Sequence, residues 1–206
     1  MKLFYAPNTI AVASVIALNE TGLPHELIKV NFASAEQTKA NYHRINPKGR
    51  VPALVSDDGI LTETSAILEY IAALKPDLEL MPTDPWQAAQ VRSVMAYLAS
   101  TMHVAHAHKM RGTRWAKEQS SFDDMRSMVP ATMSLCCQYL EENVFEQGPF
   151  VMGAHLTLAD PWLYAISLWL EGDGVTVSDY PRLSAFLDGF SQRRSVLKAK
   201  ENGAIL

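Results

Sequence analysis

The first thirty residues restrict the possible folds more than any other segment of this chain. A predicted strand at residues 2–5 is followed by a helix at residues 10–21 and by a second strand at residues 26–30. Pro7 ends the first strand, and Gly22 stops the helix. Two strands joined through such a helix lie parallel in one sheet, because the helix carries the chain back to the starting edge. The chain therefore begins as an α/β domain.

The next segment completes the pattern of a thioredoxin-like domain. The sequence predicts a weak helix at residues 36–45, hairpin strands at residues 51–55 and 60–62, and a helix at residues 64–75. Asp57-Asp58-Gly59 is typical of a tight hairpin turn. A βαβ unit, a hairpin and a helix in this order are the elements of a thioredoxin-like domain.

A proline-rich segment separates this domain from a helical one. Pro76, Pro82 and Pro85 lie in a stretch without hydrophobic periodicity, so we interpret residues 78–86 as a linker. No convincing strand follows, and helical patterns occur at residues 86–109, 123–143, 157–170 and 182–194. The predicted fold class is therefore α/β plus all-α, with a thioredoxin-like domain at residues 1–77 and an all-helical bundle domain at residues 87–206.

Composition and charge exclude several classes of protein. Hydrophobic residues make up 48% and charged residues 19% of the 206 residues, which allows a sizeable core and excludes wholesale disorder. The net charge is −4, and no basic run is longer than Arg193-Arg194, so we expect no nucleic-acid partner. The apolar run at residues 10–18 is too short to span a bilayer, so we expect neither a membrane partner nor a signal peptide.

Two features, a pair of cysteines and a capping box, have structural interpretations. Cys136 and Cys137 are adjacent, which does not suit disulfide geometry, so we expect buried free thiols and a reducing, cytoplasmic location. Residues 157–160 have the form of a capping box, with Asp160 in place of the usual Glu. We assign Thr157 and Asp160 a structural role.

Several motifs, in sequence order, resemble the cytosolic glutathione transferases, especially the bacterial beta-like branch. The resemblance covers essentially the whole chain, and the motifs that carry it are Met1–Pro7, Asn46–Leu54, Asp57–Gly59, Leu61–Thr64, Ala66-Ile67, Leu158–Asp160 and Tyr180–Leu183. The resemblance implies a detoxifying homodimer whose thioredoxin-like domain binds glutathione as co-substrate and whose helical domain lines the site of a small hydrophobic electrophile. Conjugation is the leading hypothesis. A glutathione-dependent reductase of disulfides or peroxides, and a binding protein without turnover, are the alternatives.

The resemblance also implies the residues that hold glutathione. It implies a cis bond before Pro52, which would leave the N–H and C=O of Val51 free to pair with the cysteinyl backbone of glutathione. Thr64 begins a predicted helix, where its hydroxyl and N–H suit the γ-glutamyl carboxylate, and Glu63 suits the ammonium group. The alternatives are a plain proline-containing turn and an ordinary helix cap.

The turn that should touch the sulfur departs from the beta pattern. That branch has a cysteine where this chain has Ile10, so a mixed disulfide with glutathione cannot form there. An oxygen or amide donor must activate the thiol, and we expect Thr9 first, then Asn8, which is also a glutathione-binding candidate, and Tyr5. The alternatives are a helix cap without a ligand for Thr9 and a half-buried strand residue for Tyr5.

A cluster of histidines and one tryptophan complete the predicted site. His103 aligns with the position where the beta branch has a histidine near the sulfur, and His106 shares its helix face. We expect His103 to donate to the thiolate or to a developing anion, and His106 and Trp115 to contact the electrophile. Two histidines could chelate a metal, but no third ligand with matching spacing is visible, so we expect no metal. The alternatives are a polar cleft lining for the histidines and simple packing for Trp115.

Overall fold

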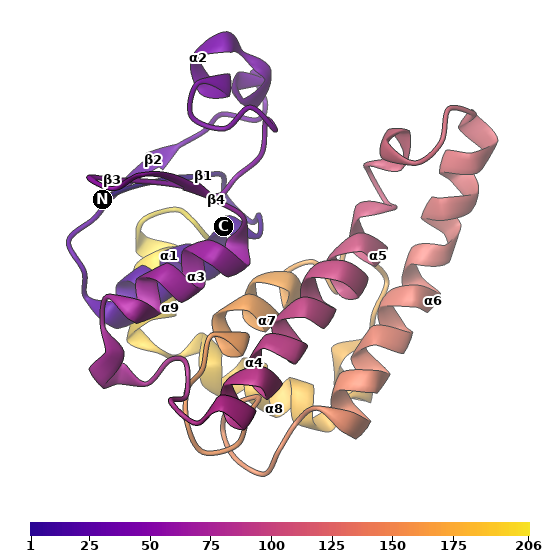
Figure 1. The fold of residues 1–206 in the computed structure, drawn as a ribbon. Coiled ribbons are helices and arrows are strands. Elements are labelled where there is room, and N and C mark those ends of the chain that lie inside the picture. The colour runs from indigo at the N-terminus through magenta and orange to yellow at the C-terminus, as the bar shows by residue number, and fades with distance from the viewer.

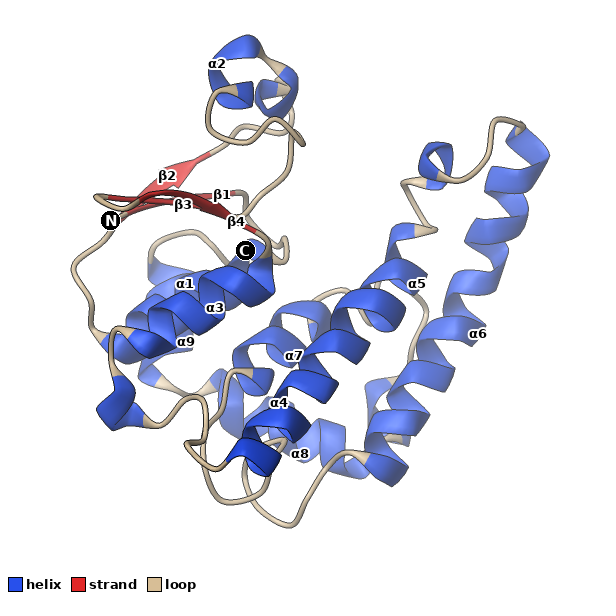
Figure 2. Cartoon of the chain, viewed as in Figure 1, coloured by secondary structure: helices blue, strands red, loops and turns tan.

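The computed structural model describes residues 1–206 and places all the strands at one end of the molecule (Figures 1 and 2). Four strands form one sheet in the order β2-β1-β3-β4. β1 and β2 are parallel, with Lys2 opposite Glu26, and β3 and β4 form an antiparallel hairpin, as the sequence predicts. β1 also pairs with β3 in the antiparallel sense. The strands span Lys2–Tyr5 (β1), Glu26–Lys29 (β2), Ala53–Ser56 (β3) and Gly59–Thr62 (β4).

Helices cover this sheet unequally. α1 and α3 lie together against one face, whereas the short α2 lies on the other side of the sheet (Figure 1). Between α3 and α4 the chain makes only a short 3-10 turn at Pro76–Leu78. The bounds of these helices are Ala11–Thr21 (α1), Ala40–His43 (α2) and Thr64–Ala73 (α3).

The rest of the chain is helical. α4 and α5 follow one line beside the long α6, and the three extend away from the sheet (Figure 1). Asp84 caps α4, because its Oδ1 accepts hydrogen bonds from the N–H groups of Trp86 and Gln87. The helices span Pro85–Tyr97 (α4), His103–Ala107 (α5), Gln119–Asn143 (α6), Ala159–Ser167 (α7), Pro181–Ser191 (α8) and Arg194–Glu201 (α9).

One continuous hydrophobic core joins the two parts of the chain. α1 packs against α3 on one side and against α7 and α9 on the other. From Ala11 to Leu18 its side chains are small or aliphatic, and Val12, Val15, Ile16 and Leu18 are fully buried. A helical segment with such side chains on every face is buried on all sides, and this part of α1 is held in this way between the sheet and the helical part. These observations confirm the predicted fold class.

Two predicted helices differ from the observed ones in their limits. A π-helical turn at Leu98–Met102 interrupts the predicted helix at residues 86–109, and that helix ends at Ala107. The long helix predicted at residues 123–143 begins earlier, at Gln119. Gln119, Ser120 and Ser121 are polar and Phe122 alone sets no hydrophobic period, so the sequence pattern does not reveal this first turn.

The C-terminal end was predicted wrongly as a single helix at residues 182–194. α8 ends at Ser191, Arg193 is extended with φ −63° and ψ 141°, and a separate helix α9 follows. The Arg193 guanidinium forms an ion pair with Glu20 of α1, with Nε 2.7 Å from Oε1. This contact joins residues far apart in the sequence, and no local pattern indicates it.

The structure confirms the interpretations of the two cysteines and of Asp160. Cys136 and Cys137 are free and buried in α6. The Asp160 carboxylate is fully buried and accepts hydrogen bonds from the N–H of Val151 at 2.8 Å and from the N–H and hydroxyl of Thr157 at 2.7 and 3.0 Å. No helix combines the length and the apolar run that a bilayer crossing needs.

Candidate functional site

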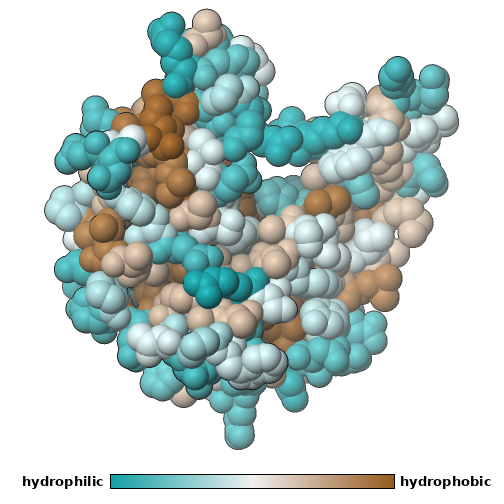
Figure 3. All heavy atoms as spheres, in the orientation of Figure 1, coloured by the Kyte–Doolittle hydropathy of each residue, from teal (hydrophilic) through white to brown (hydrophobic).

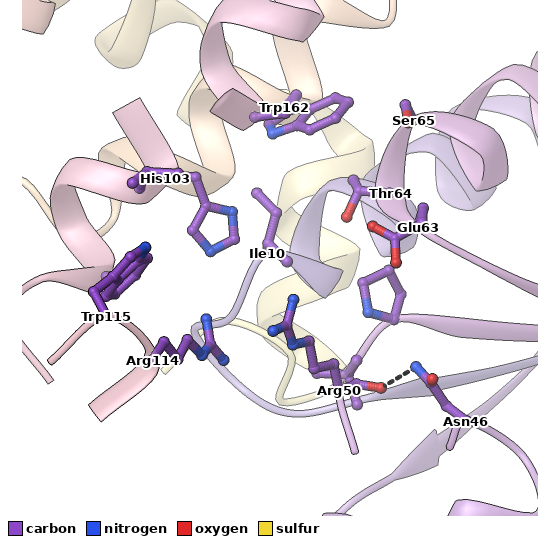
Figure 4. Close-up of a pocket in the computed structure, with 15 residues that line it drawn as sticks. Ile10, Asn46, Arg50, Glu63, Thr64, Ser65, His103, Arg114, Trp115 and Trp162 are labelled. Atoms are coloured by element: carbon purple, nitrogen blue, oxygen red, sulfur yellow. Dashed lines mark hydrogen bonds between the residues drawn. The ribbon is translucent and has the colours of Figure 1, made fainter. Parts of the chain in front are cut away.

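A cavity of about 550 Å³ lies between the thioredoxin-like part and the helical part. Figure 3 shows this face hollowed between the sheet end and the far ends of the long helices, with hydrophilic side chains around the opening. Both parts contribute to its wall, and Figure 4 shows most of the lining side chains. They are Ile10, Asn46, Arg50, Val51, Pro52, Glu63, Thr64, Ser65, Ala99, His103, Val104, Ala107, Arg114, Trp115 and Trp162.

Val51 presents unpaired main-chain groups to this cavity. The Val51-Pro52 peptide bond is cis, and neither the N–H nor the C=O of Val51 has a hydrogen-bond partner within the chain. The loop around it is held firmly, because Tyr42 Oη and Asn46 Nδ2 both donate to the carbonyl oxygen of Arg50 at 2.7 Å. An unpaired donor and acceptor on a fixed, extended segment can pair with the backbone of a peptide ligand.

The N-terminus of α3 opens onto the same cavity. Glu63 has a positive φ of 75° and does not cap the helix with its side chain. The first N–H groups of α3 have no intrahelical partner, and the Thr64 hydroxyl makes no hydrogen bond within the chain. The Glu63 carboxylate lies 2.6 Å from Lys48 Nζ. A free helix N-terminus beside a carboxylate suits a ligand group that carries both a carboxylate and an ammonium.

His103 enters the cavity from the helical part and faces Ile10 of the thioredoxin-like part (Figure 4). Neither ring nitrogen makes a hydrogen bond within the chain. Burial, with the positive charges near it at His106, Arg114 and Arg50, lowers the pKa of His103 to about 4. The imidazole is therefore neutral at physiological pH, and its single N–H can donate to a ligand.

Trp162 contributes a second unused donor. Its indole is only 2% exposed and lines the cavity, yet its Nε1–H has no partner. A buried donor without a partner costs roughly 1–3 kcal/mol.

Tyr5 and Thr9 do not line the cavity. The Tyr5 hydroxyl donates to the carbonyl of Asn202 at 3.2 Å, and burial raises its pKa. The Thr9 hydroxyl donates to the carbonyl of Ala6 at 2.7 Å. In this arrangement each hydroxyl proton is already used within the chain, so neither is presented to the cavity.

Asn8 and His106 are also held away from the cavity wall. The Asn8 backbone N–H donates to Ala204 O, and its side-chain Oδ1 accepts from the N–H of Leu206. His106 Nδ1 lies 2.6 Å from the buried carboxylate of Asp173, and its ring stacks on Trp169 at 4.1 Å. The structure therefore brings together Val51, Pro52, Glu63, Thr64, His103 and Trp115 from the predicted site, and leaves Tyr5, Asn8, Thr9 and His106 outside its lining.

Sequence reasoning did not select Arg50, Arg114 or Trp162. Arg50 directly precedes Val51 inside a recognised motif, and Arg114 directly precedes Trp115. Residues 103–117 carry four lysines or arginines and no acidic residue, which is a readable signal of positive charge without local acidic partners. The Trp162 donor has no such signal, because its environment depends on how α7 packs.

The fold and this cavity define a class of two-part proteins, in which a thioredoxin-like part and a helical part share one ligand site. Residues 1–73 match the family described as Glutathione S-transferase, N-terminal domain, and residues 106–201 match Glutathione S-transferase, C-terminal domain. The chain belongs to the glutathione S-transferase family. The resemblance inferred from the sequence is confirmed.

Similar proteins include one at more than half identity. A crystal structure of a glutathione transferase homolog from Sulfitobacter, with bound glutathione, is 53% identical, covers 98% of each chain and superimposes with a TM-score of 0.96. The glutathione S-transferase GstA of Escherichia coli O157:H7 is 28% identical over 97% of this chain and 96% of that protein. The maleylacetoacetate isomerase of Pseudomonas aeruginosa is 28% identical over 91% and 90%. Relatives of similar identity to this chain are therefore named for different reactions, a transferase and an isomerase.

Proposed function

We propose that this protein is a glutathione transferase that binds glutathione in the cavity, stabilises its thiolate and conjugates it to a small, largely apolar electrophile. One observation carries this proposal. Two sets of unpaired main-chain groups, at Val51 and at the start of α3, face the same cavity. The Sulfitobacter homolog with bound glutathione supports it.

Glutathione fits these groups in one direction. Its γ-glutamyl carboxylate would accept from the N-terminus of α3 and the Thr64 hydroxyl, while the Glu63 carboxylate would accept from its ammonium. Its cysteinyl backbone would pair with the N–H and C=O of Val51 as an added strand. This places the thiol toward Ile10 and His103, where the two parts of the protein face each other (Figure 4).

Thiol activation would use donors other than those the sequence ranked first. The N–H of Ile10, at the start of α1, has no partner within the chain, and His103 offers a neutral N–H across the cavity. Lowering a thiol pKa by about two units requires roughly 2.7 kcal/mol. One hydrogen bond to a charged group supplies about 1.5–3 kcal/mol, and a helix N-terminus adds roughly 0.3–1 kcal/mol. These two donors therefore suffice.

The proposed reaction is a substitution or an addition at carbon. The thiol proton leaves to solvent, and the sulfur forms a bond with the electrophilic carbon. In a substitution, the leaving group departs with its bonding electrons. In an addition, the electron pair of the attacked double bond moves to the neighbouring carbon, which takes up a proton from solvent. Ile10 offers no protein thiol, so the nucleophile is glutathione itself. We also propose, from the family alone, that the protein works as a cytoplasmic homodimer.

The test is a titration of the purified protein with glutathione, followed by the ultraviolet absorption of the thiolate near pH 6.5. A free thiol has a pKa near ~8.5, so a saturable thiolate band at this pH supports activation. Thr9→Val and Thr9→Ser separate the possible donors. If Ile10 and His103 donate, both variants keep the band. If Thr9 swings from Ala6 to the sulfur, only the serine variant keeps it. Binding without a band in the wild type would indicate a carrier, and no binding would contradict the proposal.

A further inference from the structure

The cavity holds unbalanced positive charge, although the protein as a whole has a net charge of −4. Arg50 and Arg114 line it, and neither guanidinium makes an ion pair or a hydrogen bond within the chain. The cavity has one acidic side chain, Glu63, and Lys48 already pairs with it at 2.6 Å. Two guanidinium charges in a site without a free carboxylate point to an anionic ligand.

The two arginines reach the cavity from different parts of the protein. Arg50 lies on the loop before Val51, and Arg114 lies on the 3-10 turn Gly112–Arg114 that follows α5. Figure 4 shows both side chains reaching into the same region, with Arg114 next to Trp115. Burial and the positive charges of Arg50 and Arg111 lower the pKa of Arg114. The charged guanidinium of Arg114 is therefore destabilised by its surroundings, and a bound anion would relieve that repulsion.

Glutathione, which the proposed function binds in this cavity, supplies a counterion for only one of the two arginines. Its γ-glutamyl carboxylate is assigned to the N-terminus of α3. Its glycyl carboxylate follows the cysteinyl residue that Val51 holds, which brings it to the adjacent Arg50. Arg114 remains without a counterion, and Figure 4 shows it next to Trp115 and on the side toward Arg50.

We propose that Arg114 binds a carboxylate of the second substrate, so that the preferred electrophiles are small aromatic or unsaturated carboxylic acids. The planar guanidinium binds a carboxylate through two parallel hydrogen bonds, and Trp115 offers a flat apolar surface for the remainder of the molecule. This inference rests on the proposed function, because the electrophilic carbon must meet the glutathione sulfur near Ile10. It adds a charge requirement that a purely hydrophobic site would not have.

The test compares two aryl chlorides of nearly equal size, 4-chloro-3-nitrobenzoate and 4-chloro-3-nitrobenzamide. With each, the thiolate sulfur bonds to the ring carbon, the C–Cl bond breaks, and chloride leaves with the bonding electrons. Each kcat/KM is divided by the uncatalysed rate with glutathione, because the amide activates the ring more strongly than the carboxylate. We expect the wild type to prefer the acid by about tenfold or more on this corrected scale.

Arg114→Gln should abolish this preference and leave the Kd for glutathione within about twofold. Arg111→Gln is the matched control, since it removes an equal charge from the same segment at an exposed position that does not line the cavity. We expect it to keep the preference. Arg50→Gln should instead weaken glutathione binding by about tenfold.

Other outcomes would overturn the inference and remain distinct from a failure of the proposed function. Equal corrected rates for the acid and the amide in the wild type would exclude a carboxylate site. A rise in the Kd for glutathione in Arg114→Gln, with the preference unchanged, would assign Arg114 to the glycyl carboxylate. If glutathione binds but neither chloride reacts, binding of 3-nitrobenzoate and 3-nitrobenzamide to the complex with S-methylglutathione decides the same point. If glutathione does not bind at all, the proposed function fails, and the inference fails with it.

Discussion

The indole Nε1–H of Trp169 donates a hydrogen bond of 2.8 Å to the main-chain carbonyl of Asn8. The helical part of the protein thereby holds the turn that leads into α1. Asn8 has a positive φ of 53°, and its N–H donates to the carbonyl of Ala204. Two segments that are distant in sequence thus fix this turn beside the cavity, which explains how the N–H of Ile10 keeps its position without a side-chain cap.

Trp169→Phe tests this relationship. Phenylalanine keeps an aromatic ring against His106 but removes the donor to Asn8, so the free energy of unfolding should fall by about 1 kcal/mol. The thiol pKa of bound glutathione should rise, because the N–H at the start of α1 loses its fixed position. Trp86→Phe is the matched control, since Trp86 is 72% exposed and its indole makes no hydrogen bond within the chain. Equal thiolate titrations in wild type and Trp169→Phe would contradict the positioning role.

Thr64→Val tests the proposed carboxylate site at α3. Valine has nearly the same shape, and the Thr64 hydroxyl makes no hydrogen bond within the chain, so the melting temperature should change little. The Kd for glutathione should rise about tenfold to a hundredfold, because a hydrogen bond to a charged group contributes roughly 1.5–3 kcal/mol. Thr64→Ser keeps the hydroxyl and should bind as the wild type does. Isothermal calorimetry measures all three, and an unchanged Kd for the valine variant would remove the hydroxyl from the site.

The order of strands and helices could be predicted because it is written in local periodicity and in the Pro and Gly residues between elements. The separate helix α9 could not, since the break before it depends on the ion pair between Arg193 and Glu20. This omission affected the predicted site. Asn202, just after α9, accepts the hydrogen bond from the Tyr5 hydroxyl. Without α9 in the predicted fold, this partner of Tyr5 could not be foreseen, and the hydroxyl was predicted to be free for the thiol.

The predicted site residues fall into two groups for a related reason. Val51, Pro52, Glu63 and Thr64 belong to short motifs in which unpaired main-chain groups act together with one carboxylate and one hydroxyl, and the structure brings them to one cavity. A hydroxyl such as that of Thr9 can turn toward a ligand or toward its own backbone, and the sequence does not distinguish these rotamers. Arg114 shows the opposite case, because its signal is the absence of acidic neighbours and not a motif.

Asp160→Asn should lower the free energy of unfolding by about 2–3 kcal/mol. The carboxylate accepts three buried hydrogen bonds, and an asparagine amide would turn its NH₂ toward at least one N–H donor and leave it unpaired. Thr157→Val is a graded control, because it removes one hydroxyl donor and should cost only about 1 kcal/mol. Chemical denaturation measures both. A variant that folds should bind glutathione with unchanged affinity, and a selective loss of binding would contradict the structural assignment.

His103 should titrate far below an ordinary histidine. Its pKa is about 4 in the folded protein against 6.5 for an ordinary histidine, so near pH 5 the unfolded chain binds a proton that the folded protein does not. The stability it contributes is present above pH 6.5 and is lost as the pH falls toward 4. The stability difference between wild type and His103→Gln should therefore fall by about 2–3 kcal/mol between about pH 7 and 4.5. NMR titration of the ring gives the pKa of His103 directly. A midpoint near ~6.5 would contradict the prediction and would show that the ring is charged in mild acid.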